Sequence, residues 1–435
     1  MHLKASFHTL GCKLNFAETA TLSKMLEGKG ISSIKPGETP DICVVNTCSV
    51  TETADKKARR LIRNLAGKYP QATIIVTGCY AQLKPEEVSL LPGVGMVLGS
   101  NEKLRLSEFL DSWLIDRQKT VKVSPGLSID RFMPSCERGE RTRYFLKVQD
   151  GCDYFCTYCT IPFARGRSRS GVIPDLVDLA REVALNGGKE IVITGVNIGT
   201  FGKDNGQDFF SLIKALDQVE GIERFRISSI EPNLLTDEII NWVARESRAF
   251  MPHFHIPLQS GSDKVLKLMN RRYDTSVFRS RIEAIHDLIP HAFIGVDIIA
   301  GARGETEEEW LKSFDFAKSL SVSKYHVFPY SERPGTKALL LGDSVKMEER
   351  HRRVACLTEL SEKKTKEFIF QNQGMVRDVL WESPSSKGNM HGLTDNYIRV
   401  SAPLKAELIN TISQITITGL DPADPEGAVA IHHAR

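Results

Sequence analysis

One stretch of the chain, Tyr144-Phe-Leu-Lys-Val-Gln-Asp-Gly-Cys152-Asp-Tyr-Phe-Cys156-Thr-Tyr-Cys159, combines an apolar run with three closely spaced cysteines. The run 144–148 is typical of a buried strand, and the C-x3-C-x2-C spacing places three thiols in the loop that follows it. Three thiolates this close can bind three irons of a four-iron cubane and leave the fourth iron without a protein ligand. Catalytic metal sites keep such an open position.

A structural zinc loop is the alternative interpretation of these three cysteines. Zinc sites usually show a second Cys or His pair at short spacing, and no such pair follows Cys159. The stretch therefore favours an iron–sulfur site over a zinc site.

Further apolar runs follow the cysteine loop, each separated from the next by a helical pattern. They are 190–194, 224–228, 254–258, 292–299 and 324–328. With the run 144–148 they predict six parallel strands and a partial (β/α)6 barrel. In barrels of this kind the chemistry lies at the carboxyl ends of the strands, where the cysteine loop also lies.

The N-terminal part also alternates apolar runs and helical patterns, so it predicts an α/β domain with an open parallel sheet. Residues 41–46 and 72–77 are expected to be buried strands, and 53–68 a helix. Three isolated cysteines each come just after a predicted strand: Cys12, Cys48 and Cys79. Their thiols should gather at one sheet edge, where open α/β folds bind ligands. Spacing alone leaves open whether they bind iron or are small buried side chains.

The remaining cysteines lack this context, and we interpret Cys43, Cys136 and Cys356 as structural. After a charged helix that ends near Lys366, short alternating runs predict a small antiparallel β-barrel of a kind that often binds RNA. The predicted division is therefore an N-terminal domain over 1–118, a linker over 119–142, a barrel over 143–368 and the small C-terminal barrel over 369–435.

The composition of the 435-residue chain, 41% hydrophobic and 26% charged, is that of a globular protein. The sequence has no apolar run long enough to span a bilayer, so we expect no membrane partner and a cytoplasmic location. Thiols stay reduced in that compartment, and this favours metal binding over disulfides for the nine cysteines. The net charge of +3 permits a nucleic-acid partner without requiring one.

Taken together, the three isolated cysteines and the C-x3-C-x2-C loop resemble the methylthiotransferase branch of the radical S-adenosylmethionine superfamily, over nearly the whole chain. Thr9-Leu-Gly-Cys-Lys-Leu-Asn15 and the run 326–336, His-Val-Phe-Pro-Tyr-Ser-Glu-Arg-Pro-Gly-Thr, look most like the threonylcarbamoyladenosine tRNA enzymes of that branch. The small C-terminal barrel would then be a TRAM domain. Enzymes acting on isopentenyladenosine tRNA or on a ribosomal protein are the nearest alternatives.

The resemblance implies two [4Fe-4S] clusters, with Cys12, Cys48 and Cys79 binding the auxiliary one and Cys152, Cys156 and Cys159 the radical-generating one. It also implies S-adenosylmethionine as methyl donor and radical source. The residues expected to bind this cofactor are Tyr158, Gly188, Glu190, Ser229, Glu231, Gln259 and Asp297. Residues 301–306 read Gly-Ala-Arg-Gly-Glu-Thr where the family pattern leads us to expect Gly-Phe-Pro-Gly-Glu-Thr, so the loop conformation there is open.

The implied reaction adds a methylthio group to C2 of the modified adenosine at position 37, in the anticodon loop of tRNA. It also implies an electron donor such as flavodoxin or ferredoxin, and a sulfur source. A threonylcarbamoyl group carries a carboxylate, which an arginine should pair with, and Arg165, Arg167 and Arg333 are the candidates. The RNA phosphates have three candidate basic segments: 56–63, 165–169 and 350–366.

A different class of function would be a non-catalytic iron–sulfur protein that binds RNA or transfers electrons. Both clusters would then have four protein ligands, and neither constellation has a fourth cysteine nearby. A zinc-binding RNA module is a further alternative.

Overall fold

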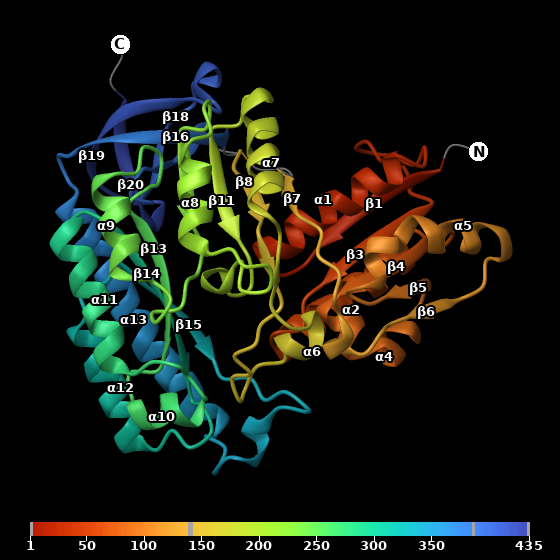
Figure 1. Cartoon of the computed structure of the whole chain (residues 1–435), viewed down its shortest axis with the longest axis horizontal. Coiled ribbons are helices and arrows are strands. Elements are labelled where there is room, and N and C mark those ends of the chain that lie inside the picture. The colour runs from red at the N-terminus through yellow and green to blue at the C-terminus, as the bar shows by residue number, and fades with distance from the viewer. Residues whose placement is uncertain (1–2, 138–141, 385–387, 433–435) are drawn as a thin grey trace.

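The computed structural model describes residues 3–137, 142–384 and 388–432. Three bodies follow one another along the chain: an N-terminal α/β unit, a central set of parallel strands with helices outside, and a C-terminal β-barrel (Figure 1). The predicted fold class is confirmed. None of the helices in these described ranges is long and apolar enough to cross a membrane.

The N-terminal unit is built on a fully parallel sheet with the strand order β2-β1-β3-β4-β5-β6. Its strands are β1 (Lys4–Thr9), β2 (Ser32–Ser33), β3 (Ile42–Thr47), β4 (Thr73–Gly78), β5 (Val94–Leu98) and β6 (Thr120–Lys122). β3 and β4 lie in the middle and are almost continuously apolar because helices cover both faces. Cys43 and Val45 of β3 pack into one apolar cluster, and Val44 packs into the other, on the opposite face.

Five α-helices surround this sheet. They are α1 (Lys13–Glu27), α2 (Glu52–Lys68), α3 (Cys79–Leu83), α4 (Pro85–Ser89) and α5 (Leu106–Asp116). Thr51 caps α2, since its side chain accepts a hydrogen bond from the Ala54 backbone N–H at 3.2 Å. Cys12 occupies the cap position of α1 without a side-chain bond to the helix backbone, and its thiol donates to Asn15 Oδ1 at 3.8 Å.

The central unit contains the six predicted parallel strands. These are β8 (Tyr144–Lys147), β11 (Glu190–Thr194), β12 (Arg224–Ile227), β13 (His253–Gln259), β14 (Phe293–Ala300) and β15 (Lys324–Pro329). Two parallel bridges, Phe225 to Phe250 and Ser229 to His255, join the two halves between β12 and β13. No pairing joins β8 to β15 among the described residues, so the barrel is partial.

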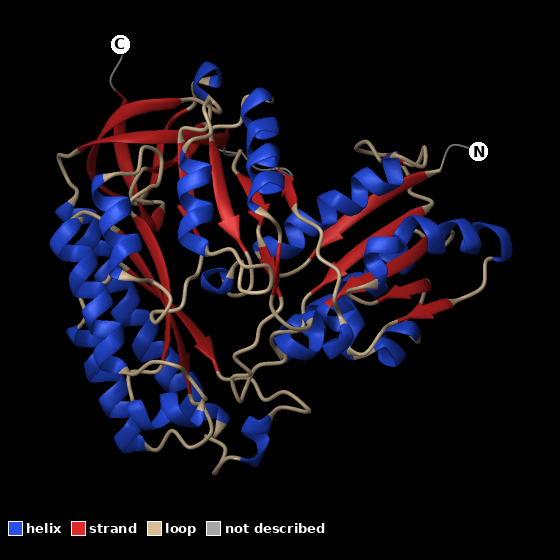
Figure 2. Cartoon of the chain, in the orientation of Figure 1, coloured by secondary structure: helices blue, strands red, loops and turns tan. Residues whose placement is uncertain are grey.

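Helices form the outer layer of the central unit (Figure 2). They are α7 (Ile173–Leu185), α8 (Phe209–Asp217), α9 (Asp237–Arg245), α10 (Asp263–Leu268), α11 (Thr275–Leu288), α12 (Glu307–Ser319) and α13 (Met347–Gln371). The short helix α6 (Ile161–Arg165) instead packs against α3 of the N-terminal unit. Two short strands, β9 (Gln149–Asp150) and β10 (Arg169–Ser170), pair beside the cysteine loop. A single apolar cluster fills the space between these helices and the sheet.

The C-terminal unit is a closed barrel with the strand order β16-β17-β18-β20-β19. Its strands are β16 (Val376–Pro384), β17 (Asn389–Thr394), β18 (Arg399–Pro403), β19 (Ile412–Asp421) and β20 (Asp424–His432). The sequence predicts an antiparallel barrel, but β18 and β20 pair in parallel. This parallel pair closes the barrel, since the two strands are not consecutive in the chain.

The C-terminal barrel packs against the central sheet where the parallel strands begin. Arg226 of β12 donates to the carbonyls of Thr394 and Asp395, both at 2.8 Å, and Arg224 donates to the carbonyl of Leu393 at 3.0 Å. The barrel therefore lies at the end opposite to the cysteine loop, which follows the carboxyl end of β8.

The predicted linker over 119–142 is not free of regular structure. It contains β6, which extends the N-terminal sheet, and β7 (Ser135–Glu137), which pairs antiparallel with β8. Both are three-residue edge strands, too short to produce a periodic pattern in the sequence. Residues 138–141 of the predicted linker lie outside the described residues.

Candidate active site

The three N-terminal cysteines lie at the carboxyl edge of neighbouring strands. Cys12 follows β1, Cys48 directly follows β3, and Cys79 directly follows β4. In the sheet order these strands are β1-β3-β4, without a strand between them. The structure thus brings together the thiols that the sequence pattern places at one edge.

Two glycines permit the close approach of these loops. Gly11 has φ +102°, and a Cβ there would lie 2.6 Å from Cβ of Cys48. Gly78 has φ +91°, and a Cβ there would lie 2.3 Å from the carbonyl oxygen of Thr47. Side chains at both positions would push the cysteine loops apart, so glycine is required by space as well as by conformation.

Burial and the neighbouring thiols raise the pKa of two of these cysteines, Cys48 and Cys79. Burial raises the pKa of Cys79 to about 12 against the opposing charge of Arg165, and the Cys48 and Cys12 thiols add to the rise. Burial is also the main cause of the raised pKa of Cys48. Cys79 is buried, Cys48 is half-buried and Cys12 is exposed. All three would bind metal as thiolates, because the metal replaces their protons.

The second cysteine group lies in the loop after β9. Phe155, inside that loop, has the left-handed φ of 50°, which turns the chain between Cys152 and Cys156. Backbone N–H groups point at the outer two sulfurs: Tyr154 donates to Cys152 Sγ at 3.4 Å and Ile161 to Cys159 Sγ at 3.5 Å. N–H to sulfur bonds of this kind tune iron–sulfur clusters.

An arginine stands beside the middle cysteine of this loop. Arg271 donates from Nη1 to Cys156 Sγ at 3.1 Å, from Nε to the Tyr273 hydroxyl at 3.1 Å, and from Nη2 to the Glu231 carboxylate. Burial raises the pKa of Glu231, although the charge of Arg271 opposes the rise. The guanidinium therefore links a cluster candidate to a carboxylate at the end of β12.

Each cysteine group offers three sulfurs, the number that a cubane with one open iron takes from a protein. Within 3–137, 142–384 and 388–432, no three His, Cys, Asp or Glu side chains are placed to share one metal ion. A cubane binds each thiolate to a different iron, so its ligands lie further apart than those of one ion. None of the nine cysteines, all of which the structure describes, forms a disulfide, and each group offers three sulfurs as ligands.

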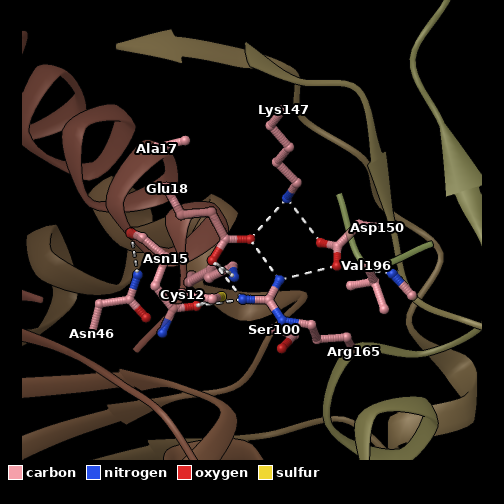
Figure 3. Close-up of polar contacts among 12 residues, drawn as sticks. Cys12, Asn15, Ala17, Glu18, Asn46, Ser100, Lys147, Asp150, Arg165 and Val196 are labelled. Atoms are coloured by element: carbon pink, nitrogen blue, oxygen red, sulfur yellow. Dashed lines mark hydrogen bonds and ion pairs between the residues drawn. The ribbon is translucent and has the colours of Figure 1, made fainter. Parts of the chain in front are cut away.

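A buried charge network connects the two cysteine groups (Figure 3). Glu18 of α1 pairs with Lys147 at the end of β8 (2.8 Å), with Lys103 (2.7 Å) and with Arg165 of α6 (3.0 Å). Arg165 also pairs with Asp150 at 3.0 Å. Asp150 comes two residues before Cys152, so the network joins the N-terminal sheet edge to the cysteine loop of the barrel.

The cations of this network stabilise the charged form of the Glu18 carboxylate. Burial would raise the pKa of Glu18, but Arg165, Lys103 and Lys147 outweigh it and hold that pKa well below its ordinary value. Arg165 also donates to Asn15 Oδ1 at 2.5 Å, three residues beyond Cys12. Since a buried ion pair is stable only with complete hydrogen bonding, the network fixes one relative position of the two units.

Comparison with known proteins identifies the two halves of this site. Residues 4–99 match the model of the uncharacterized protein family UPF0004, and residues 146–317 match that of the radical SAM superfamily. The chain is 37% identical over 426 residues to threonylcarbamoyladenosine tRNA methylthiotransferase MtaB of Bacillus subtilis, covering 95% of this chain and 93% of the relative. The chain belongs to the radical S-adenosylmethionine methylthiotransferase family.

Other members of the family are also similar over most of their length. MtaB of Aquifex aeolicus is 35% identical, with 92% of this chain and 96% of the relative covered. The tRNA-2-methylthio-N(6)-dimethylallyladenosine synthase of Pelotomaculum thermopropionicum is 30% identical, with 97% of both covered. Among solved structures, the radical S-adenosylmethionine methyltransferase TsrM from Kitasatospora setae shares the fold, with TM-score 0.57, 14% identity, and 78% of this chain and 77% of that chain covered.

Two of the residues predicted to bind S-adenosylmethionine lie at the wrong end of the barrel. Glu190 begins β11, opposite the start of β12, and pairs with Arg226 at 2.9 Å. Gly188 lies before β11, where a Cβ would come within 2.4 Å of Val183, so glycine there serves helix packing. The prediction for these two residues is corrected, because the cysteine loop follows the opposite ends of the strands.

The carboxyl end of β11 carries the residues that do lie beside the cysteine loop. Asn197 is buried and donates to Cys152 Sγ at 3.9 Å, while its Oδ1 has no hydrogen-bond partner. Gln149 Oε1 accepts from the backbone N–H groups of Val196 and Asn197 at 2.9 and 2.8 Å. A strand end followed by Gly195 is the sequence signal that could have found them.

The other predicted cofactor residues do lie toward the cysteine side of the barrel. Tyr158 packs on an apolar cluster that includes Met269 and Tyr330. Ser229 forms the bridge to β13, and Gln259 ends β13 with φ 67°. Asp297 Oδ1 lies within hydrogen-bond distance of His255 Nε2, at 2.8 Å. Their role in binding S-adenosylmethionine remains a prediction, as does that of Glu231.

The three arginines predicted to bind a substrate carboxylate have different surroundings. Arg165 is buried in the network described above, where it pairs with Glu18 and Asp150. Arg333 pairs with Asp55 of α2 at 2.9 Å and donates to Ser49 at 2.7 Å. Arg167 is exposed and lies 3.4 Å from Asp153. As placed, Arg165 and Arg333 both pair with carboxylates of the N-terminal unit.

The departure at residues 301–306 has a structural explanation. Arg303 pairs with Glu332 at 3.0 Å and donates to the carbonyl of Gly342 at 3.1 Å. Ala302 is buried in the cluster below Tyr158. Arg303 thus ties the 301–306 loop to the segment that carries Arg333.

Proposed function

We propose that this enzyme adds a methylthio group to C2 of N6-threonylcarbamoyladenosine at position 37 of tRNA. The observation that carries the proposal is that two three-cysteine groups, each lacking a fourth cysteine, face one domain boundary and are joined through Glu18, Arg165 and Asp150. Relatives named for threonylcarbamoyladenosine are 31–37% identical to the chain, and relatives named for dimethylallyladenosine are 30–32% identical.

Cys12, Cys48 and Cys79 would bind the auxiliary [4Fe-4S] cluster, and Cys152, Cys156 and Cys159 the cluster whose open iron binds S-adenosylmethionine. When bound, these groups supply the methyl group, the sulfur and the one-electron chemistry that replacing the C2–H of an adenine requires. Acid–base chemistry by side chains does not suffice, because that hydrogen is not acidic at neutral pH.

The residues of the chain position and shield this chemistry. Arg271 and the N–H groups of Tyr154 and Ile161 stabilise negative charge on the sulfurs of the cysteine loop. The Glu18 network holds the N-terminal sheet edge over the barrel, and its burial excludes water from that boundary.

The base would come from the anticodon loop, where bases are unpaired and enter a pocket without opening a duplex. A basic face of α2 is the best surface for the RNA backbone, since Lys56, Lys57, Arg60 and Arg63 are exposed there. Arg59 is not part of this exposed set, because it pairs with Glu52 and Glu87.

The other two predicted basic segments are less suited to RNA. Arg350, Arg353 and Lys364 are buried and braced by carboxylates or carbonyls within the barrel. Within 165–169, Arg165 and Arg169 are buried. Only the face of α2 is therefore kept as the proposed phosphate contact. An external electron donor, such as flavodoxin or ferredoxin, and a sulfur source complete the proposed reaction in the cytoplasm.

The test uses anaerobically reconstituted enzyme with dithionite, S-adenosylmethionine and anticodon stem-loops that carry threonylcarbamoyladenosine, isopentenyladenosine or unmodified adenosine. Mass spectrometry follows 5′-deoxyadenosine and the methylthio-nucleoside. We expect both products with the threonylcarbamoyl loop, their loss in Cys156→Ala, and no loss in Cys356→Ala, a cysteine on α13 outside the site. If the methylthio product formed only from the isopentenyladenosine loop, isopentenyladenosine and not threonylcarbamoyladenosine would be the substrate.

A further inference from the structure

A cavity of about 530 Å³ lies between the central unit and the C-terminal barrel, which covers the starts of the central strands (Figure 1). Side chains of β14, β15 and α13 line it from one side, and side chains of β17 and β18 from the other. Small organic ligands bind in cavities of roughly 300 to 1,000 Å³. Among the described residues that line it, none is a cysteine. The cavity is therefore a candidate site separate from the two cysteine groups.

The ring of Tyr397 is fixed at one wall of this cavity. Its centre lies 4.2 Å from the centre of the His253 ring and 5.5 Å from that of Phe293. The Arg226 guanidinium lies over the same ring, 5.0 Å from its centre, and Arg143 donates to the Tyr397 hydroxyl at 3.5 Å. These contacts hold the ring in place before any ligand binds.

The backbone of Tyr397 is strained. Its φ is 67°, in the left-handed region, and it lies in the turn that joins β17 to β18. A bulky aromatic residue is uncommon in that conformation, where glycine or asparagine usually stands. Strain of this kind persists where the surroundings fix the residue, and it gathers at ligand sites. The conformation thus indicates that the ring has a role beyond completing the turn.

Two of the cations that line the cavity are paired with carboxylates. Arg143 pairs with Glu382 at 2.8 Å, and Lys324 pairs with Glu426 at 2.6 Å. A phosphate or carboxylate entering the cavity would meet these two glutamates, so the lining does not favour an anion. It favours a neutral group with both donors and acceptors, because the paired residues offer both.

Aromatic side chains supply the rest of the lining. Phe293 and Phe368 come from the central unit, and His391 and Tyr397 from the C-terminal barrel. Bases of unpaired nucleotides stack on Phe, Tyr and His side chains. A nucleobase is flat, neutral and carries both donors and acceptors, so it is the class of ligand that suits the aromatic and the paired polar parts of the lining.

A base stacked on Tyr397 is too far from the cysteine loop to be the base that reacts. Phe293, beside the Tyr397 ring, is the first residue of β14, whereas Ala302, just beyond the other end of β14, packs in one cluster with Tyr158 of the cysteine loop. The eight residues of β14 span about 23 Å, at roughly 3.3 Å for each step between them. The base in the cavity must therefore belong to another nucleotide.

We propose that this cavity binds the base of an unpaired nucleotide of the substrate RNA other than the adenosine that is modified. The inference rests on the part of the proposed function that takes an anticodon loop as the substrate, and it adds a second point of recognition. A loop held at two points, about one strand length apart, would present its target base to the cysteine loop in one orientation.

The test pairs changes in the RNA with changes in the cavity. Each unpaired nucleotide of an anticodon stem-loop is replaced in turn by an abasic one, and anaerobic fluorescence anisotropy measures Kd with the reconstituted full-length enzyme. We expect one position other than the modified adenosine at which loss of the base weakens binding roughly tenfold or more. This effect should largely disappear in Tyr397→Leu and persist in Tyr397→Phe, which keeps the ring.

Two further variants separate binding from folding. His391→Ala removes a second ring of the lining and should also reduce the effect of the abasic nucleotide. Lys405→Gln changes an exposed residue between β18 and β19 that does not line the cavity, and it should leave the effect unchanged. Circular dichroism shows which variants fold, and if Tyr397→Leu does not, His391→Ala decides the outcome in its place.

Two results would overturn the inference while the proposed function stands. One is that no loop nucleotide depends on the cavity variants, and the other is that the modified adenosine is the only one that does. Dependence at another nucleotide supports the inference even if the methylthio product forms only from the isopentenyladenosine loop, which would overturn the proposed substrate. An enzyme that binds none of the stem-loops would overturn both.

Discussion

Glu18 of the N-terminal unit and Arg165 of the barrel form a two-point ion pair, with Nη1 to Oε1 at 3.0 Å and Nη2 to Oε2 at 3.2 Å. The two residues are 147 positions apart in the chain. Both are almost completely buried, and Lys103 and Lys147 share the same carboxylate. The pair therefore joins the two cysteine groups into one site.

Removing the Glu18 charge should destabilise the protein strongly. Glu18→Gln would leave Arg165, Lys103 and Lys147 with less negative charge in a buried place, and breaking such a pair costs about 3 to 5 kcal/mol. We expect a lower thermal midpoint, measured by circular dichroism on apo-protein. Glu108→Gln, which changes an exposed glutamate paired with Arg105, should shift the midpoint little. Equal shifts in the two variants would contradict the role of the network.

The same carboxylate should make stability depend on acid pH. The pKa of Glu18 is lower in the folded protein than its ordinary value of 4.5, so its contribution is complete above that value and is lost as the pH falls toward the folded pKa. The difference in free energy of unfolding between wild type and Glu18→Gln should stay constant above about pH 5 and shrink below it. Urea titrations at several pH values measure this, and a constant difference throughout would refute it.

Iron content should separate ligand cysteines from structural ones. We expect about eight irons in the reconstituted enzyme and about four in Cys79→Ala or Cys159→Ala, since each cubane holds four. Cys43→Ala is the control, because Cys43 is buried in β3 and packs within an apolar cluster of the sheet. Iron assay and visible absorption give the result. Full iron loading in Cys79→Ala would contradict the auxiliary ligand set.

The sequence predicted the cysteine positions well because each one follows a strand whose apolar run is easily recognised. It failed for Gly188 and Glu190, since a short Gly-rich motif does not reveal at which end of β11 it lies. That depends on the register, which pairs Glu190 with the start of β12. Nor could it reveal the partners of Arg165 and Arg333, because Glu18 and Asp55 are 147 and 278 residues distant.

The contacts of Arg303 could not be predicted from the sequence for the same reason, because this residue joins segments that are distant in the chain. Arg303→Ala should release the loop 332–342 by removing the pair with Glu332 and the bond to the Gly342 carbonyl. We expect faster limited proteolysis within that loop, while the fold is retained. Arg352→Ala, which removes exposed ion pairs with Glu307 and Glu349, serves as the control. An unchanged cleavage rate for Arg303→Ala would show that the loop does not depend on it.

If the basic face of α2 contacts tRNA phosphates, the salt dependence of tRNA binding should depend on its lysines and arginines. If Lys57 contacts a phosphate, Lys57→Gln should weaken binding and reduce the slope of log Kd against log salt by roughly 0.7 to 0.9, because one fewer counterion is released. Lys29→Gln is the matched control, since Lys29 is exposed and pairs with Asp111 on a different part of the N-terminal unit. Filter binding between about 50 and 200 mM salt covers the range in which phosphate contacts dominate. A slope that falls equally in both variants would mean that net charge alone matters, whereas a fall confined to Lys57→Gln assigns the phosphate contact to α2.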